Sequence, residues 1–129
     1  MIVVPRSADL KYPPAVRREK ILLCLDWLLE FRFSSQAVLA ARLGQRTPHI
    51  SRVIASMLED GLIKFMKNVH TRHQRFFYLA AGGVSILEGE GRDVSRAVTR
   101  ADWLGRYSRI MHDLAVQHLL VKRLSGYRE

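Results

Sequence analysis

Cysteine and long apolar runs are scarce in this sequence of 129 residues. Its single cysteine, Cys24, cannot form a disulfide within the chain, and we expect a buried, unreactive thiol in a reducing compartment. No stretch reaches the roughly 18 apolar residues that a membrane span needs. The first residues also lack the charged start and apolar core of a signal peptide. A cytoplasmic protein without membrane contact is therefore expected.

Acidic residues are few as well, and they are distributed unevenly. The 21 Lys and Arg outnumber the 12 Asp and Glu, which leaves a net charge of +9. Such an excess suits a polyanionic partner such as nucleic acid, although ribosomal and membrane-surface proteins share it. Residues 61–80 carry four basic side chains and no acidic one. The strongest positive charge is thus confined to a short stretch in the middle of the chain.

Catalytic and metal-binding motifs are missing. His70 and His73 have a ligand-like spacing, but no second pair of Cys or His stands nearby, so a zinc site is not expected. No serine lies in a nucleophile motif, and the glycines at 82–83 and 89–91 match no phosphate-binding fingerprint. We expect no enzyme, no metal site and no cofactor.

Apolar residues at three- and four-residue steps predict three helices after an extended arm over residues 1–15. The first covers residues 16–31 and is apolar on most sides. Ser34–Gln36 supplies the N-cap of a second, short helix that ends at Gly44. Thr47–Glu59 forms the third, with a capping hydroxyl and a proline at its start. Two short helices joined by a tight turn are the skeleton of a helix-turn-helix.

The period changes after the third helix. Residues 62–67 and 75–79 are rich in β-formers and flank a polar stretch, which predicts a two-stranded hairpin with a basic, exposed tip. Three more helices are expected: residues 84–88 after a break at Gly82-Gly83, residues 93–107 capped by Asp93, and a last one from Ser108 or Arg109 to about Leu124. The fold class is therefore mainly α with a small β-hairpin (α+β).

The order of these elements is that of a winged helix-turn-helix with additional C-terminal helices. We expect the domain to cover residues 16–88 and a helical extension to cover residues 89–129. The last helix has more apolar surface than a lone outer helix needs, so it packs against the helix at 16–31 or pairs with a second copy. A homodimer through the first and last helices is expected. The basic stripe Arg92, Arg96 and Arg100 is expected to face solvent rather than DNA.

The third helix is the candidate recognition helix. At about 100° per residue, its apolar positions form one broad stripe that must face the core. Arg52 on the other side has the forked donors that match a guanine edge, while His49 and Ser56 can reach bases or phosphates. An ordinary solvated helix would show the same pattern, but the basic hairpin directly behind it favours DNA contact.

The hairpin is the second candidate element. Cations held beside a recognition helix can contact phosphates, and Arg72 at the tip can alternatively enter a minor groove. Charges on an edge strand also resist aggregation, but four without a counter-charge exceed that need. The DNA-contacting residues expected are Arg46, Thr47, His49, Arg52, Ser56, Lys64, Lys67, His70, Arg72, His73 and Arg75.

Three segments carry a family resemblance. Residues 30–44, 51–63 and 78–87 resemble winged-helix domains, and the likeness covers about residues 16–88. The chain is most similar to the replication-relaxation family of plasmid and mobile-element proteins, in which a winged-helix start leads to a segment like His112–His118. The resemblance implies a role in plasmid replication, transfer or mobilisation, or in regulating such genes, with other replication or transfer proteins as partners.

The function expected is double-stranded DNA binding, as a transcriptional regulator or a plasmid replication or transfer accessory factor. Residues 47–59 would read the major groove, and residues 62–79 would contact phosphate or the minor groove. The alternative is a protein-interaction module, in which the same scaffold binds no specific DNA and the apolar last helix binds a partner.

Overall fold

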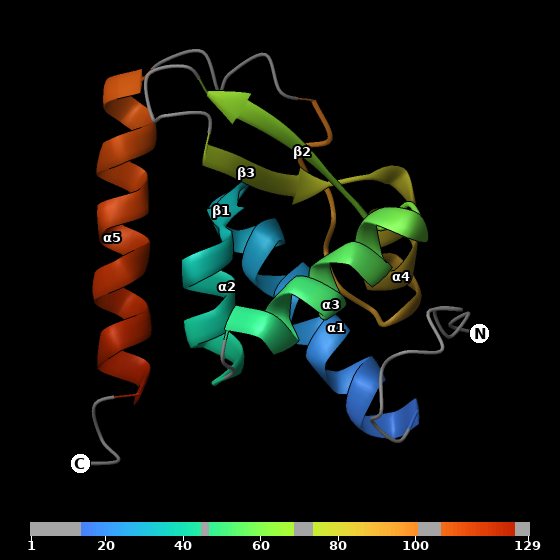
Figure 1. Cartoon of the computed structure of the whole chain (residues 1–129). Helices are drawn as coiled ribbons and strands as arrows, with labels where there is room; N and C mark the ends of the chain where they lie inside the picture. Colours follow the sequence, from blue (N-terminus) through green and yellow to red (C-terminus); the bar gives the residue numbers. More distant parts are fainter. Residues whose placement is uncertain (1–13, 45–46, 69–73, 101–106, 126–129) are drawn as a thin grey trace.

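The computed structural model describes residues 14–44, 47–68, 74–100 and 107–125 and is mainly helical with a small antiparallel sheet (Figure 1). This confirms the expected α+β class. None of the helices in these ranges combines the length and apolar character of a membrane span. The elements in chain order are α1 (Pro14–Phe31), β1 (Ser34–Ser35), α2 (Gln36–Leu43), α3 (Thr47–Glu59), β2 (Ile63–Asn68), β3 (Gln74–Leu79), α4 (Ala81–Gly89) and α5 (Tyr107–Ser125).

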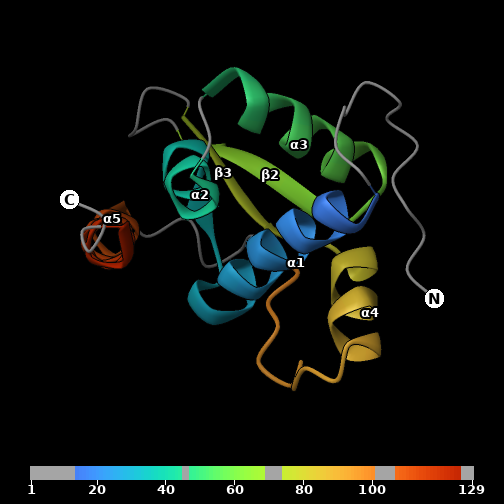
Figure 2. The same ribbon diagram turned by 90° about the horizontal axis from the view of Figure 1, so that it is seen from below.

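Helix α1 lies at the centre of the helical layer, between α3 and α4 (Figure 2). Cys24, Leu25 and Leu28 are fully buried in it, which confirms the expectation that the helix is covered on most sides. The burial raises the pKa of the Cys24 thiol to about 12. Since the thiolate is the reactive form, this thiol is inert in the folded protein, as its apolar neighbours indicated.

Helix α2 begins and ends where its capping residues predict. Ser35 Oγ accepts the backbone N–H of Val38 at 3.2 Å, and Gly44 takes the left-handed conformation with φ 65°. Ser34 and Ser35 also form the short strand β1, which pairs with Phe77 and Phe76 of β3. The sequence pattern did not predict this strand, because two residues are too few to show an alternation of polar and apolar side chains.

The predicted hairpin is confirmed and lies at one side of a three-stranded sheet. The strand order is β1-β3-β2, with both pairings antiparallel, so β2 is an edge strand. Lys67 lies opposite Arg75, and Lys64 lies opposite Tyr78. Because side chains alternate between faces along a strand, Lys67 and Arg75 share one face of the hairpin and Lys64 lies on the other. Residues 69–73, between the strands, lie outside the described residues.

The expected helix break at Gly82-Gly83 is wrong, because both glycines lie inside α4. The two glycines let this helix approach the chain that leads into β2. A Cβ atom on Gly83 would lie 2.3 Å from the carbonyl oxygen of Leu62, and one on Gly82 would lie 2.6 Å from that of Gly61. Glycine is thus required here for a close approach of backbone to backbone rather than for a turn.

Replacing Gly83 by alanine is therefore expected to destabilise the fold by about 1–3 kcal/mol, because the new methyl group displaces backbone in a packed core. Urea unfolding followed by circular dichroism measures the loss. Gly89→Ala is the matched control: it lies in the same helix, its Cβ would meet nothing within 4 Å, and it should be neutral or slightly stabilising. Equal effects of the two variants would contradict the close approach.

The expected helix over residues 93–107 is wrong for residues 93–100, which are irregular; residues 101–106 lie outside the described part of the chain. The Asp93 carboxylate accepts the backbone N–H of Ser95 at 3.0 Å, and this bond holds the pKa of Asp93 below its ordinary value. A local turn of this kind competes with a helix start. The three arginines at 92, 96 and 100 consequently form no helical stripe. Arg92 instead forms an ion pair with Asp26 of α1.

Helix α5 stands at the edge of the molecule beside α2 and β1 (Figures 1 and 2). One stripe of the helix is buried, and it consists of Ile110, Leu114, Gln117 and Val121. Gln117 joins α5 to the body of the fold: its Nε2 donates to the carbonyl oxygen of Phe33 at 2.8 Å, and its Oε1 accepts the indole N–H of Trp27 at 2.9 Å. The last helix therefore packs mainly against α2 and β1, and it meets the first helix at the hydrogen bond to Trp27.

Candidate nucleic-acid interface

Helix α3 has one buried and one open side, as its periodicity predicts. The residues that face the core are Ile50, Val53, Ile54, Met57 and, half-buried, Leu58. Arg52, Ala55 and Glu59 are exposed on the other side. Figure 2 shows α3 at the top edge of the molecule, with α1 between it and α4. Its open side is therefore accessible to a large ligand such as a duplex.

The expectation that Ser56 lies on the open side of α3 is wrong. Ser56 is fully buried, and its Oγ has no hydrogen-bond partner. At about 100° per residue, Ser56 lies only about 60° from Val53, so it belongs to the edge of the buried stripe rather than to the outer surface. Its hydroxyl cannot reach DNA in this conformation.

The start of α3 is held against α2. Gln36 Nε2 of α2 donates to Ser51 Oγ of α3 at 2.8 Å, which helps to fix the angle between the two helices. Thr47 begins α3, as expected. The side chains of Thr47 and His49, like the whole of Arg46, lie outside what the structure describes. Arg52 is thus the one expected base-reading residue of this helix that the described side chains show to be exposed.

The hairpin places its cations on two faces. Lys67 and Arg75 are cross-strand neighbours on one face, while the exposed Lys64 lies on the other. Within the described ranges neither lysine forms an ion pair. Their charge is consequently available to an anionic partner. His70, Arg72 and His73 at the tip are outside the described residues.

Arg75 is held by two aromatic rings. Its Cζ lies 5.2 Å from the ring centroids of both Phe65 and Phe77, within the distance of about 6 Å at which a cation is attracted to a ring face. Phe77 is fully buried, whereas Phe65 is 43% exposed. The stack restrains the guanidinium at the surface of the sheet. Phe65 was missed as a site residue, although its alternation with Lys64 and Met66 already placed it on the face of Lys67.

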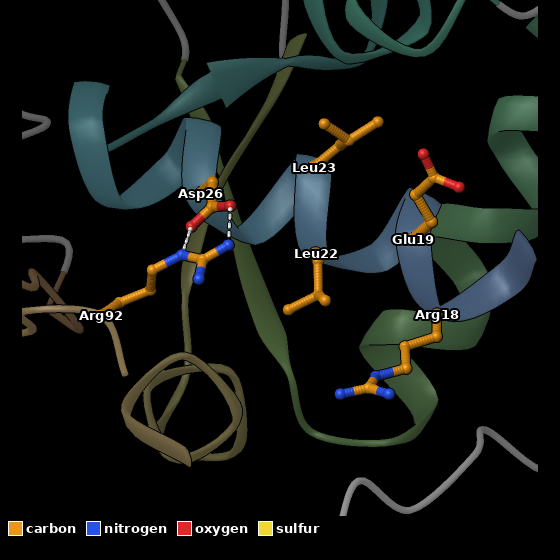
Figure 3. Close-up of a pocket in the computed structure, with 6 residues that line it drawn as sticks. All are labelled: Arg18, Glu19, Leu22, Leu23, Asp26 and Arg92. Carbon is orange, nitrogen blue, oxygen red and sulfur yellow. Dashed lines mark hydrogen bonds and ion pairs between the residues drawn. The ribbon is translucent and has the colours of Figure 1, made fainter. Parts of the chain in front are cut away.

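A separate hollow of about 360 Å³ lies between α1 and the segment after α4 (Figure 3). Three of the charged side chains that line it form ion pairs, namely Arg18, Asp26 and Arg92. Arg92 binds Asp26 through Nε–Oδ1 at 3.0 Å and Nη2–Oδ2 at 3.1 Å, and Arg18 binds Glu90. The lining residues are Arg18, Glu19, Leu22, Leu23, Asp26 and Arg92. The hollow contains none of the expected DNA-contacting residues.

Among the described side chains, no three His, Cys, Asp or Glu residues lie close enough together to hold a metal ion. Comparison with models of protein families found no match to this chain, and a search of curated proteins found none either. The assignment of function therefore rests on the geometry of α3 and the hairpin and on the sequence resemblance.

Proposed function

We propose that this chain is a double-stranded DNA-binding protein of the winged helix-turn-helix kind. The observation that carries the proposal is the position of a hairpin with uncompensated cations directly after a helix with one open side. Only Asp60, Gly61 and Leu62 lie between the end of α3 and the start of β2. The element order α1, β1, α2, α3, β2, β3 supports the same interpretation. Strand β1, which connects α1 to α2, pairs with β3 of the hairpin.

In the proposed complex α3 enters the major groove, and Arg52 contacts a base edge. Lys67 and Arg75, with Lys64 from the other face, contact phosphates or the adjacent minor groove. The two rings around Arg75 reduce the side-chain entropy that its guanidinium loses on binding. The sequence resemblance adds a role in transcription regulation or in plasmid replication or transfer, within the cytoplasm.

The test of the proposal uses Arg52. A preferred duplex is first selected from a randomised pool, and binding to it is compared with binding to an unselected duplex. Arg52→Ala should weaken the selected duplex by about 1–3 kcal/mol and the unselected one much less, because only a base contact carries sequence information. Arg96→Ala, an exposed arginine outside the interface, is the control. Equal losses on both duplexes would contradict the base-reading role.

One observation favours a second function, that of a protein-interaction module. Among the described large apolar side chains that are exposed, five belong to α5 and the remaining one is Phe65. Large exposed apolar patches usually mark contacts with another molecule. Because α5 stands apart from α3 in Figure 2, such a contact is compatible with DNA binding.

A further inference from the structure

Helix α5 has an apolar side that the fold leaves uncovered. Its members, here called the outer stripe, are Val116, Leu119, Leu120 and Leu124, with exposed fractions of 38%, 69%, 37% and 60%. At about 100° per residue they cover one side of the helix, next to the buried stripe but distinct from it. Exposure of such a surface to water is unfavourable, because the transfer of aliphatic side chains out of water lowers the free energy.

The charges along the outer stripe make it complementary to itself. Asp113 lies towards the N-terminal end of α5 and Arg123 towards its C-terminal end, and both fall within the angular range of the outer stripe. Each is five positions from His118, which is about 7.5 Å along the axis. If two such helices pair antiparallel about His118, Asp113 of one lies level with Arg123 of the other. The same pairing places Val116 level with Leu120.

A parallel pair would instead bring Asp113 level with Asp113 and Arg123 level with Arg123, and like charges repel. The antiparallel arrangement gives two opposite-charge pairs around an aliphatic centre. It also obeys the rule of a two-fold interface, in which residue i contacts residue j and j contacts i. The charge pattern is thus complementary to a second copy of this chain in the antiparallel orientation.

We propose that α5 forms a homodimer by antiparallel pairing of its outer stripe with that of a second copy. The structure narrows the expected dimer surface, because α1 is packed against α2, α4 and β3, and among the helix side chains that the structure describes the exposed large apolar ones all belong to α5. The outer stripe covers about two and a half turns of helix, a small contact compared with a standard interface, so dissociation in the micromolar range is expected. The proposal does not depend on DNA binding.

Sedimentation equilibrium of the full chain without DNA tests the pairing. The protein concentration is varied from about 5 to about 200 µM, which brackets the expected dissociation constant. The wild type should form a dimer, and Leu119→Glu should be monomeric. Met111→Glu is the matched control, because Met111 is 41% exposed on the same helix but lies outside the outer stripe. It should remain a dimer. A monomeric wild type, or a dimer that survives Leu119→Glu, would overturn the proposal.

A charge exchange tests the antiparallel geometry. Asp113→Arg alone and Arg123→Asp alone should each weaken the dimer about tenfold or more, because each replaces two attractive pairs by two repulsive ones. The double variant restores opposite charges at both positions and should recover most of the affinity. Helix content by circular dichroism confirms that each variant is folded. Failure of the double variant to recover, with all variants folded, would rule out this arrangement.

Discussion

Replacing Lys67 and Arg75 together by alanine is expected to lower the affinity for any duplex about 60-fold at 0.1 M monovalent salt. Each lost phosphate contact removes the release of about 0.9 counterion, which corresponds to roughly an eightfold loss at this salt concentration. The slope of log K against log salt should become shallower by about two units. Fluorescence anisotropy of a labelled duplex, repeated across salt concentrations, measures both quantities.

The two substitutions also remove the cation–π contacts of Arg75, which stabilise the hairpin by about 0.5–1 kcal/mol. Circular dichroism therefore accompanies the titration. Arg96→Ala with Arg100→Ala is the control for net charge, because these arginines lie in the irregular segment after α4. If the control pair lowers the affinity and the salt slope as much as the hairpin pair, the hairpin is no specific contact surface.

Replacing Gln117 by leucine is expected to destabilise the fold by about 1–3 kcal/mol. Leucine fills a similar volume, but the indole N–H of Trp27 and the carbonyl oxygen of Phe33 then lose their partner. A buried group left without a hydrogen bond costs about 1–3 kcal/mol, and the indole N–H of Trp27 is such a group here. Urea unfolding monitored by tryptophan fluorescence and circular dichroism measures the change.

Gln36→Leu is the matched control, because Gln36 also donates a hydrogen bond between helices but does so at the surface. Its cost should stay below about 1 kcal/mol, since water replaces the lost partner. Adding Trp27→Phe to Gln117→Leu removes the orphaned indole N–H, so the second change should cost less in the variant than in the wild type. Additive costs would show that Gln117 acts through packing alone.

The parts of the fold that the sequence predicted are those with strong local signals. Ser35 and Gly44 mark the ends of α2 because each satisfies backbone groups that a helix end leaves open. The stripe of α3 is clear because five apolar residues recur between Ile50 and Leu58, over about two and a half turns. The hairpin was evident because β-formers flank a polar stretch.

The parts that it missed depend on contacts between distant residues. Gly82 and Gly83 look like a chain break, and only their distance to the carbonyl oxygens of Gly61 and Leu62 explains their presence in a helix. Asp93 looks like a helix cap, yet its bond to Ser95 closes a local turn. Ser34 and Ser35 form the strand β1 because their backbone pairs with that of β3, which is distant in the sequence.

For the candidate site, too, some positions were predicted correctly and others were not. The exposure of Arg52 and Lys67 agrees with their expected roles, because both positions follow from the local period. The prediction for Ser56 was wrong because this residue lies at the boundary of the buried stripe, where a small rotation about the helix axis decides whether a side chain is buried. Gln117 was missed because a polar residue among Ile110, Leu114 and Val121 reveals its role only through its partners Trp27 and Phe33.

The most direct test of the central claim is the binding of the wild-type chain to a mixed-sequence duplex at 50 and 200 mM salt, followed by fluorescence anisotropy. The proposed interface predicts measurable binding at 50 mM and clearly weaker binding at 200 mM, because phosphate contacts release counterions. The protein is folded and in excess over the duplex, at a concentration on the order of tens of micromolar. If it does not bind at 50 mM salt, the claim that α3 and the hairpin form a DNA-binding surface is contradicted.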